Sequence, residues 1–158
     1  MSITSSQFEN LSGETRIRQG SEFVQIPNLV PAGEQLTAGQ FVRMQDGAFY
    51  KSMQPTHLVL KSGEPRITPF EVSSITGNIV LEGEPTLAVT AGPGVVTIPF
   101  QTTVYTGDLL TVSVDGYAVK KTGAGYVIGT AMEDMIVTGN NLEWGNAMIT
   151  LPAAYNAS

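Results

Sequence analysis

The chain has 158 residues and a mass of 16.8 kDa, a length that suits one compact domain with extensions and is too short for two independent cores. Charged residues make up only 14% of it, and the net charge of −6 has the wrong sign for neutralising nucleic-acid phosphates, so we expect no direct nucleic-acid partner. The absence of cysteine excludes disulfides, thiolate catalysis and Cys-based zinc sites.

Residues 1–22 are mostly polar, and their apolar side chains Phe8, Leu11 and Ile17 are spaced too irregularly for a helical stripe. We expect an extended N-terminal arm, either a disordered terminus or a segment that becomes ordered against a neighbouring molecule. The beginning of the chain lacks the features of a signal peptide, and no stretch reaches the roughly 18 apolar residues of a membrane span. We therefore expect no membrane partner.

From Phe23 onward, runs of β-branched and aromatic residues alternate with Gly, Pro, Asn and Asp, which is the pattern of strands and turns. Met132–Ile136 has some helix propensity, but the segment is only of turn length. The sequence predicts an all-β protein with little helix: a single β domain over residues 23–158, as a small β-sandwich or barrel-like fold, with a jelly roll also compatible. The strands are expected at 23–26, 41–45, 48–52, 57–61, 70–75, 78–82, 86–90, 95–98, 102–105, 109–114, 117–121, 126–131 and 147–151.

Two Asp-Gly pairs separate strand patterns. Asp115-Gly116 follows the alternating run 109–114, and Asp46-Gly47 follows Phe41–Gln45. An Asp-Gly pair between two strands favours a hairpin with a type I′ turn, in which both central residues have positive φ. The sequence predicts a hairpin at each pair.

One short sequence pattern, here called the repeated phrase, occurs twice in the chain. Ala38–Val42 aligns with Thr106–Leu110, and, after one gap, Tyr50-Lys51 aligns with Val119-Lys120. The phrase reads small-Gly-polar-apolar-apolar, then a strand, Asp-Gly, a second strand and a Lys. A true duplication and a similarity due only to turn chemistry both explain it.

Side chains for catalysis are few. The only histidine, His57, lies in the apolar pattern Thr56–Leu60, where a structural role is more common than a general base. Asp108 and Asp115 lie at expected strand entries and turns, and Glu133-Asp134 is the only adjacent acidic pair. We expect no catalytic residue, no metal site and no cofactor. A competing hypothesis is an enzyme that uses Glu133, Asp134 and His57.

Aromatic side chains support a different class of function. Trp144 lies among Gly and Asn in a predicted loop, where an indole serves as a sugar-stacking platform, an interface anchor or a hydrophobic plug. Tyr126 and Tyr155 are further stacking candidates. The alternative function is therefore a carbohydrate-binding β module or a receptor-binding fibre or spike domain.

Several segments resemble the capsid cement or head decoration proteins of tailed bacteriophages. They are Pro31–Gly33, Leu36–Val42, Asp46-Gly47, Thr106–Leu110, Val114–Gly116, Val119–Lys121, Tyr126–Asp134 and Ala147–Leu151. Residues 54–102 have no place in that pattern, and we expect them to form an inserted or expanded sheet.

This resemblance implies a structural virion protein without enzyme activity. Such a protein binds the exterior of an assembled capsid, usually as a homotrimer, and stabilises contacts between copies of the major capsid protein after assembly in the host cytoplasm. The capsid and self-interface candidates are Phe8, Leu11, Ile17, Phe23 and Trp144. Dispersed negative charge and low charge density are compatible with this role.

Overall fold

A computed structural model describes residues 15–19, 23–26, 30–63 and 79–157, and within these ranges every regular element is a β-strand. The prediction of an all-β, barrel-like fold is confirmed, and residues 132–136 form no helix. The strands are β1 (Arg16–Gln19), β2 (Phe23–Ile26), β3 (Leu36–Thr37), β4 (Phe41–Gln45), β5 (Ala48–Lys51), β6 (His57–Ser62), β7 (Ile79–Val80), β8 (Thr86–Phe100), β9 (Leu109–Val112), β10 (Ala118–Lys120), β11 (Gly125–Ala131) and β12 (Glu143–Asn156).

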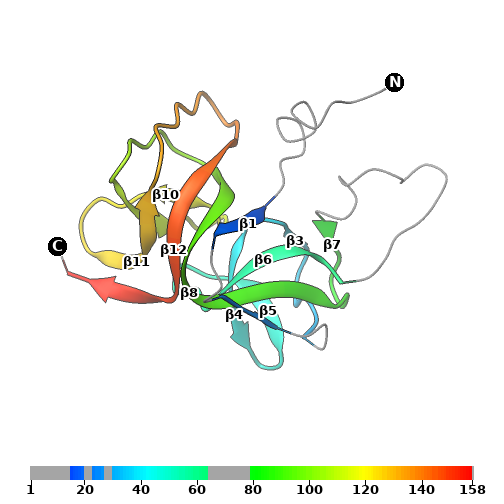
Figure 1. The fold of residues 1–158 in the computed structure, drawn as a ribbon. Coiled ribbons are helices and arrows are strands. Elements are labelled where there is room, and N and C mark those ends of the chain that lie inside the picture. The colour runs from blue at the N-terminus through cyan, green and yellow to red at the C-terminus, as the bar shows by residue number, and fades with distance from the viewer. Residues whose placement is uncertain (1–14, 20–22, 27–29, 64–78, 158) are drawn as a thin grey trace, which may run out of the picture.

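The strands expected at 86–90 and 95–98 are one 15-residue strand, β8. The sequence suggested a break because Ala91–Gly94 contains two glycines and a proline. The chain bends there, with a φ of 71° at Ala91 and 102° at Gly92, but the pairing to neighbouring strands continues through the bend. Figure 1 shows β8 curving from one group of strands to the other.

The C-terminal half of β8 closes a five-stranded barrel, which we name the second barrel because it follows another one in the chain. The ring runs from β8 to β12, β11, β9 and β10, and returns to β8 through the parallel pair Ala118 and Phe100. Apolar and polar side chains alternate little along residues 95–100 of β8, because neighbouring segments cover both faces of this part of the strand. A large cluster of buried residues, including Val96, Ile98 and Leu110, fills this second barrel.

The N-terminal half of β8 closes a first barrel with β6, β4 and β5. Residues 31–32 complete that ring, because Pro31 bridges Pro85 at the start of β8 and Ala32 bridges Phe49 of β5. The interior holds a separate buried cluster: Ala32, Leu36, Val42, Phe49, Val59, Val80 and Ala88. The described residues thus form two buried clusters, and these are not independent. A short chain fills two interiors because both barrels use the same strand, β8.

Other predicted boundaries differ from the structure. The strand expected at 102–105 is reduced to a single bridge between Val104 and Met135, and the one expected at 70–75 lies outside the described residues. Trp144, expected in a loop, lies in β12. Within the expected arm, Arg16–Gln19 form β1 and pair with β8, while residues 1–14 lie outside the described ranges.

Both predicted hairpins are present, with different turns. At Asp46-Gly47 both φ angles are positive, 51° and 80°, and Gln45 pairs with Ala48, which is the predicted type I′ geometry. At the second hairpin only Gly116 has a positive φ, 87°. Its N–H donates to the Ser113 carbonyl at 2.9 Å, so this loop has three residues and ends in a glycine bulge. The type I′ prediction is wrong there, because Val114 occupies the first loop position.

The repeated phrase corresponds to a repeated structure. In the first barrel, the Gln40 N–H donates to the Thr37 carbonyl (3.1 Å), and the Gln40 Oε1 accepts from the Thr37 N–H (2.7 Å). In the second barrel, Asp108 makes the same two contacts with Tyr105, each at 2.9 Å. Gly39 and Gly107 both have a φ of 93°, as a type II turn requires.

Each of the two turns is fixed to the equivalent neighbouring strand. The Gly39 N–H donates to Val59, and the Gly107 N–H donates to Ala131, at 2.9 and 2.8 Å. Residues 57–62 and 86–90 thus correspond to β11 and β12 and complete the first barrel, while residues 95–100 line the second. The described part of the 54–102 region is therefore not an insertion. The two barrels are structural repeats of one another, which favours duplication over shared turn chemistry.

Substitution of the two equivalent glycines tests how the repeats pack. A Cβ at Gly39 would overlap the ring of Pro99, whereas a Cβ at Gly107 would meet nothing within 4 Å. We expect Gly107→Ala to lower the free energy of unfolding by about 1 kcal/mol through its positive φ alone, and Gly39→Ala to lower it by about 3 kcal/mol. Urea unfolding measures both, and equal losses would show that the Gly39 contact does not contribute.

Candidate functional site

His57 has the environment of a structural histidine. Its ring is buried, lies 5.1 Å from the ring of Phe49, and has its Nδ1 2.7 Å from the Thr56 Oγ1. Burial lowers the pKa of His57 below 6.5, which favours the neutral form. Nothing in this arrangement presents His57 to a substrate.

The four acidic candidates accept hydrogen bonds that hold turns in place. Asp108 accepts a hydrogen bond from the Tyr105 N–H, and Asp115 accepts one from the Gln101 Nε2, both at 2.9 Å. Glu133 accepts from the Asn146 N–H at 2.8 Å. Asp134 accepts from the N–H and the Oγ1 of Thr106, at 2.8 and 3.1 Å. Glu133 and Asp134 thus bind different segments and do not converge. Across the described ranges, no three His, Asp or Glu side chains gather as metal ligands would.

The interface candidates are dispersed. Ile17 lies on β1 with 40% of its surface exposed, and Phe23 on β2 is half-buried against the large cluster. Trp144 is half-buried in β12, paired with Pro99. Phe8 and Leu11 lie outside the described residues. The three described candidates thus lie on three different strands, each of which pairs with β8.

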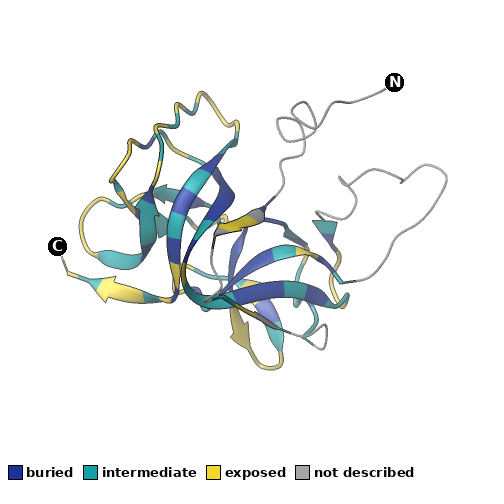
Figure 2. Ribbon diagram, viewed as in Figure 1, coloured by how far each residue is buried: buried dark blue, intermediate teal, exposed yellow. Residues whose placement is uncertain are grey.

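Two of the proposed stacking residues do meet. Tyr126 and Tyr155 are cross-strand partners on β11 and β12, and their rings are 5.3 Å apart in an edge-to-face arrangement. The Gln54 Nε2 donates to the Tyr126 hydroxyl at 2.8 Å, and Tyr155 is 61% exposed. Figure 2 shows that this end of β12 is exposed. Trp144 lies near the opposite end of β12 and does not join the pair.

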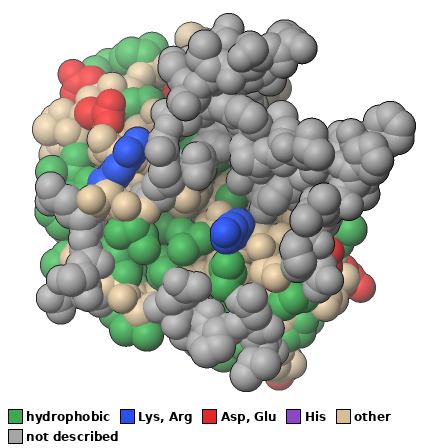
Figure 3. All heavy atoms as spheres, turned by 45° about the vertical axis from the view of Figure 1, so that its right-hand side comes forward, with side chains coloured by type: hydrophobic (Ala, Val, Ile, Leu, Met, Phe, Trp, Pro, Cys, Tyr) green, Lys and Arg blue, Asp and Glu red, His purple; other side chains and the backbone are tan. Residues whose placement is uncertain are grey.

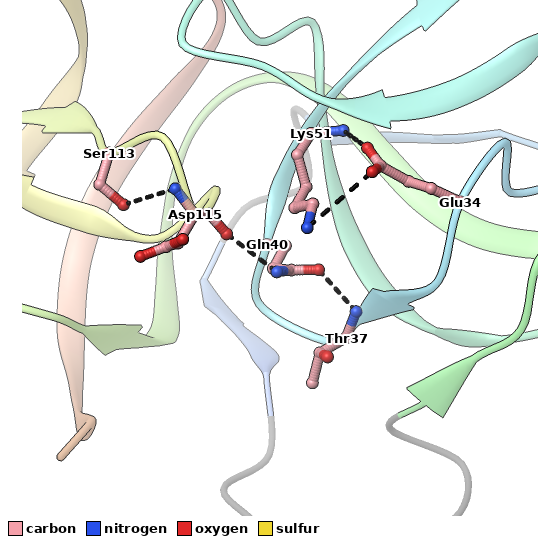
Figure 4. Close-up of polar contacts among 6 residues, drawn as sticks. All are labelled: Glu34, Thr37, Gln40, Lys51, Ser113 and Asp115. Carbon is pink, nitrogen blue, oxygen red and sulfur yellow. Dashed lines mark hydrogen bonds and ion pairs between the residues drawn. The ribbon is translucent and has the colours of Figure 1, made fainter. Parts of the chain in front are cut away.

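At the junction between the two barrels, the Gln40 side chain makes hydrogen bonds to both of them (Figure 4). Its Nε2 donates to the Asp115 carbonyl of the second barrel at 2.9 Å, while its Oε1 caps Thr37. The next residue, Phe41, donates its N–H to the Gly116 carbonyl at 2.7 Å. The turn before β4 is therefore attached to the tip of the β9–β10 hairpin.

Lys51 supports this junction from β5. Its N–H donates to the Glu34 Oε2 at 2.8 Å, and its Nζ lies 3.9 Å from the Glu34 Oε1 (Figure 4). The Lys51 stem covers Gly116, because its Cγ lies 3.2 Å from where a Gly116 Cβ would be. The contacts at this junction fix one barrel on the other, and sequence reasoning had not identified the junction as a site.

The outer surface has a large apolar component. Figure 3 shows a face on which hydrophobic side chains lie side by side around a few basic ones. The exposed large hydrophobic residues are Ile17, Val24, Met44, Tyr50, Met53, Leu81, Tyr105, Leu109, Val114, Met132, Ile136 and Tyr155. Single exposed residues of this kind are ordinary on a protein surface, and only a contiguous apolar patch indicates a contact surface. Within the described residues there is no helix long and apolar enough to cross a membrane.

The pKa of His57 predicts acid sensitivity. Its folded-state pKa lies below 6.5, so below that pH the unfolded state binds a proton that the folded state does not. We expect the free energy of unfolding to fall as the pH drops through 6.5, and expect His57→Gln to remove this part of the dependence. Urea unfolding at several pH values measures the effect, and an imidazole NMR titration with a midpoint above 6.5 would contradict it.

No protein-family model matches the chain, and no curated protein matches its sequence. Among solved structures, the chain is similar to the N base of the head fibre protein gp8.5 of bacteriophage phi29, with a TM-score of 0.50 and 17% sequence identity. The match covers 81% of this chain and 94% of the head fibre chain. At this identity the similarity concerns the fold, and it extends over both barrels.

Proposed function

We propose that this chain is a structural, non-enzymatic protein of a bacteriophage virion, attached to the exterior of the head. The observation that carries the proposal is the fold: a chain described as the base of a head fibre matches it over 94% of its length. The side chains support it, because the candidate catalytic residues are engaged in turns and packing, and the surface offers apolar contact area.

At a finer level, we propose that the protein binds the major capsid protein as a homotrimer, stabilises contacts between capsid subunits, and joins the head in the host cytoplasm. Weak contacts repeated over a shell act together, so no single interface needs high affinity. The net charge of −6 suits the outside of a shell that encloses DNA.

Reconstitution on phage heads tests this role. We expect the protein to co-sediment with heads that lack it and to raise the temperature at which those heads release DNA. Bovine serum albumin at equal concentration is the control for nonspecific adsorption. Heads whose binding and DNA retention are unchanged by the protein would contradict the proposal.

Deletion of N-terminal residues tests the expected contact between the arm and the capsid. Deleting residues 1–14 leaves β1 in place, so we expect the β fold to keep its stability while capsid binding weakens by at least about tenfold, a loss of about 1.4 kcal/mol. Deleting residues 1–20 also removes β1 from the edge of β8, and should lower the unfolding free energy as well. Co-sedimentation and urea unfolding measure both properties. Unchanged binding after either deletion would show that the arm does not contact the capsid.

The tyrosine pair favours a second candidate, receptor or glycan binding at the exposed end of β12. Aromatic rings stack on sugar faces, and Gln54 supplies a polar neighbour. If a glycan array detects a ligand, Tyr155→Ala should weaken its binding about tenfold, whereas Met132→Ala, at a residue 45% exposed just after the other end of β11, should not. An array without a ligand would exclude this candidate.

A further inference from the structure

The contact between the two barrels uses different surfaces on each. The first barrel contributes the turn at 37–40 and three side chains that point out of its own interior: Phe41, Leu58 and Val89. These are 0%, 0% and 1% exposed, and they belong to the large cluster of the second barrel. A surface that would otherwise be solvent-facing is thus completely covered.

The second barrel contributes Pro99 and the tip of its β9–β10 hairpin. The Pro99 ring lies against Gly39, the Gly116 carbonyl accepts the Phe41 N–H, and both Gly116 and Val112 are buried. Because the partners present different surfaces, the contact is head-to-tail, and each barrel retains the surface that the other one uses.

The second barrel carries an equivalent of the turn contributed by the first, and in the described residues this equivalent is only partly covered. Leu109 takes the place of Phe41 and is 41% exposed, and Tyr105 takes the place of Thr37 and is 51% exposed. Thr130 and Met148 take the places of Leu58 and Val89, and both are half-buried. We name Tyr105, Leu109, Thr130 and Met148 the turn surface.

The first barrel carries an equivalent of the hairpin contributed by the second, and in the described residues this equivalent is only partly covered. Pro31 corresponds to Pro99 and is only half-buried, and Met44 corresponds to the fully buried Val112 and is 40% exposed. Asp46 and Gly47 are exposed, and a Cβ at Gly47 would meet nothing within 4 Å. We name Pro31, Met44, Asp46 and Gly47 the hairpin surface.

We propose that the turn surface of one chain docks on the hairpin surface of a second copy, and so repeats between chains the contact that already joins the two barrels within one chain. The Leu109 N–H takes the part of the Phe41 N–H and donates to the Gly47 carbonyl of the next copy. Each chain has one surface of each kind, so the copies either close into a ring or continue as a filament. Each of these surfaces is equivalent to one that already joins the two barrels within the chain. A second copy of the chain is therefore the partner that fits both surfaces.

The polar contacts at the proposed interface differ in one respect from those at the junction between the two barrels. Asp108 replaces Gln40 and cannot donate a hydrogen bond, but Lys120, the equivalent of Lys51, lies 3.8 Å from it. The Lys120 stem covers Gly47 of the next copy, as the Lys51 stem covers Gly116 within the chain. The Lys120 ammonium then lies near Asp46 of that next copy. The contact should therefore weaken as the salt concentration rises.

Two complementary variants test this inference on the full-length purified chain, independently of any role on a capsid. Leu109→Asp disrupts the turn surface and Met44→Asp disrupts the hairpin surface. Light scattering should give a multiple of 16.8 kDa for the native chain and a single chain for each variant. An equimolar mixture of the variants should form a two-chain species, because each retains the surface that the other has lost.

Matched controls are Leu81→Asp and Met53→Asp, at residues 47% and 54% exposed outside both surfaces, and both should assemble like the native chain. The two-chain species in the mixture also shows that both variants are folded. A native chain that stays monomeric, a mixture that forms no two-chain species, or controls that dissociate as the variants do would each overturn the inference. Failure of capsid binding alone would leave it standing.

Discussion

The fold depends on one long strand, β8, which supplies a wall to each of two small barrels. Its N-terminal half pairs with β6 and its C-terminal half with β12. A strand can serve both rings only if it bends without losing its hydrogen bonds, and positive φ angles at Ala91 and Gly92 provide that bend. Neither ring would close without β8, so we expect the two barrels to depend on one another for stability.

The sharing of β8 explains how a short chain fills two interiors. The smaller cluster lies wholly in the first barrel, but Phe41, Leu58 and Val89 point away from it and join the larger cluster. The outer face of one barrel thus becomes part of the core of the next. The same face in the second barrel is only partly covered among the described residues, and this difference between two equivalent surfaces is the basis of the proposed self-assembly.

The polar side chains of both barrels are used to hold turns and the junction in place. Asp108 and Gln40 hold equivalent turns, Asp134 holds Thr106, and the Glu34–Lys51 pair supports the junction. Side chains used in this way hold the backbone of the turns and of the junction in place.

The sequence by itself determined the all-β class, the two hairpins and the repeated phrase, because alternation and Asp-Gly turns are properties of short segments. It identified Tyr126 and Tyr155 but not that they meet while Trp144 lies apart, and it misread Ala91–Gly94 as a break. The continuity of β8, the closing of each ring and the burial of Phe41 beside the exposure of Leu109 were decided by the tertiary structure alone. These features arise from hydrogen bonds and packing between segments distant in sequence, and identical local patterns acquire different surroundings according to what the rest of the chain places over them.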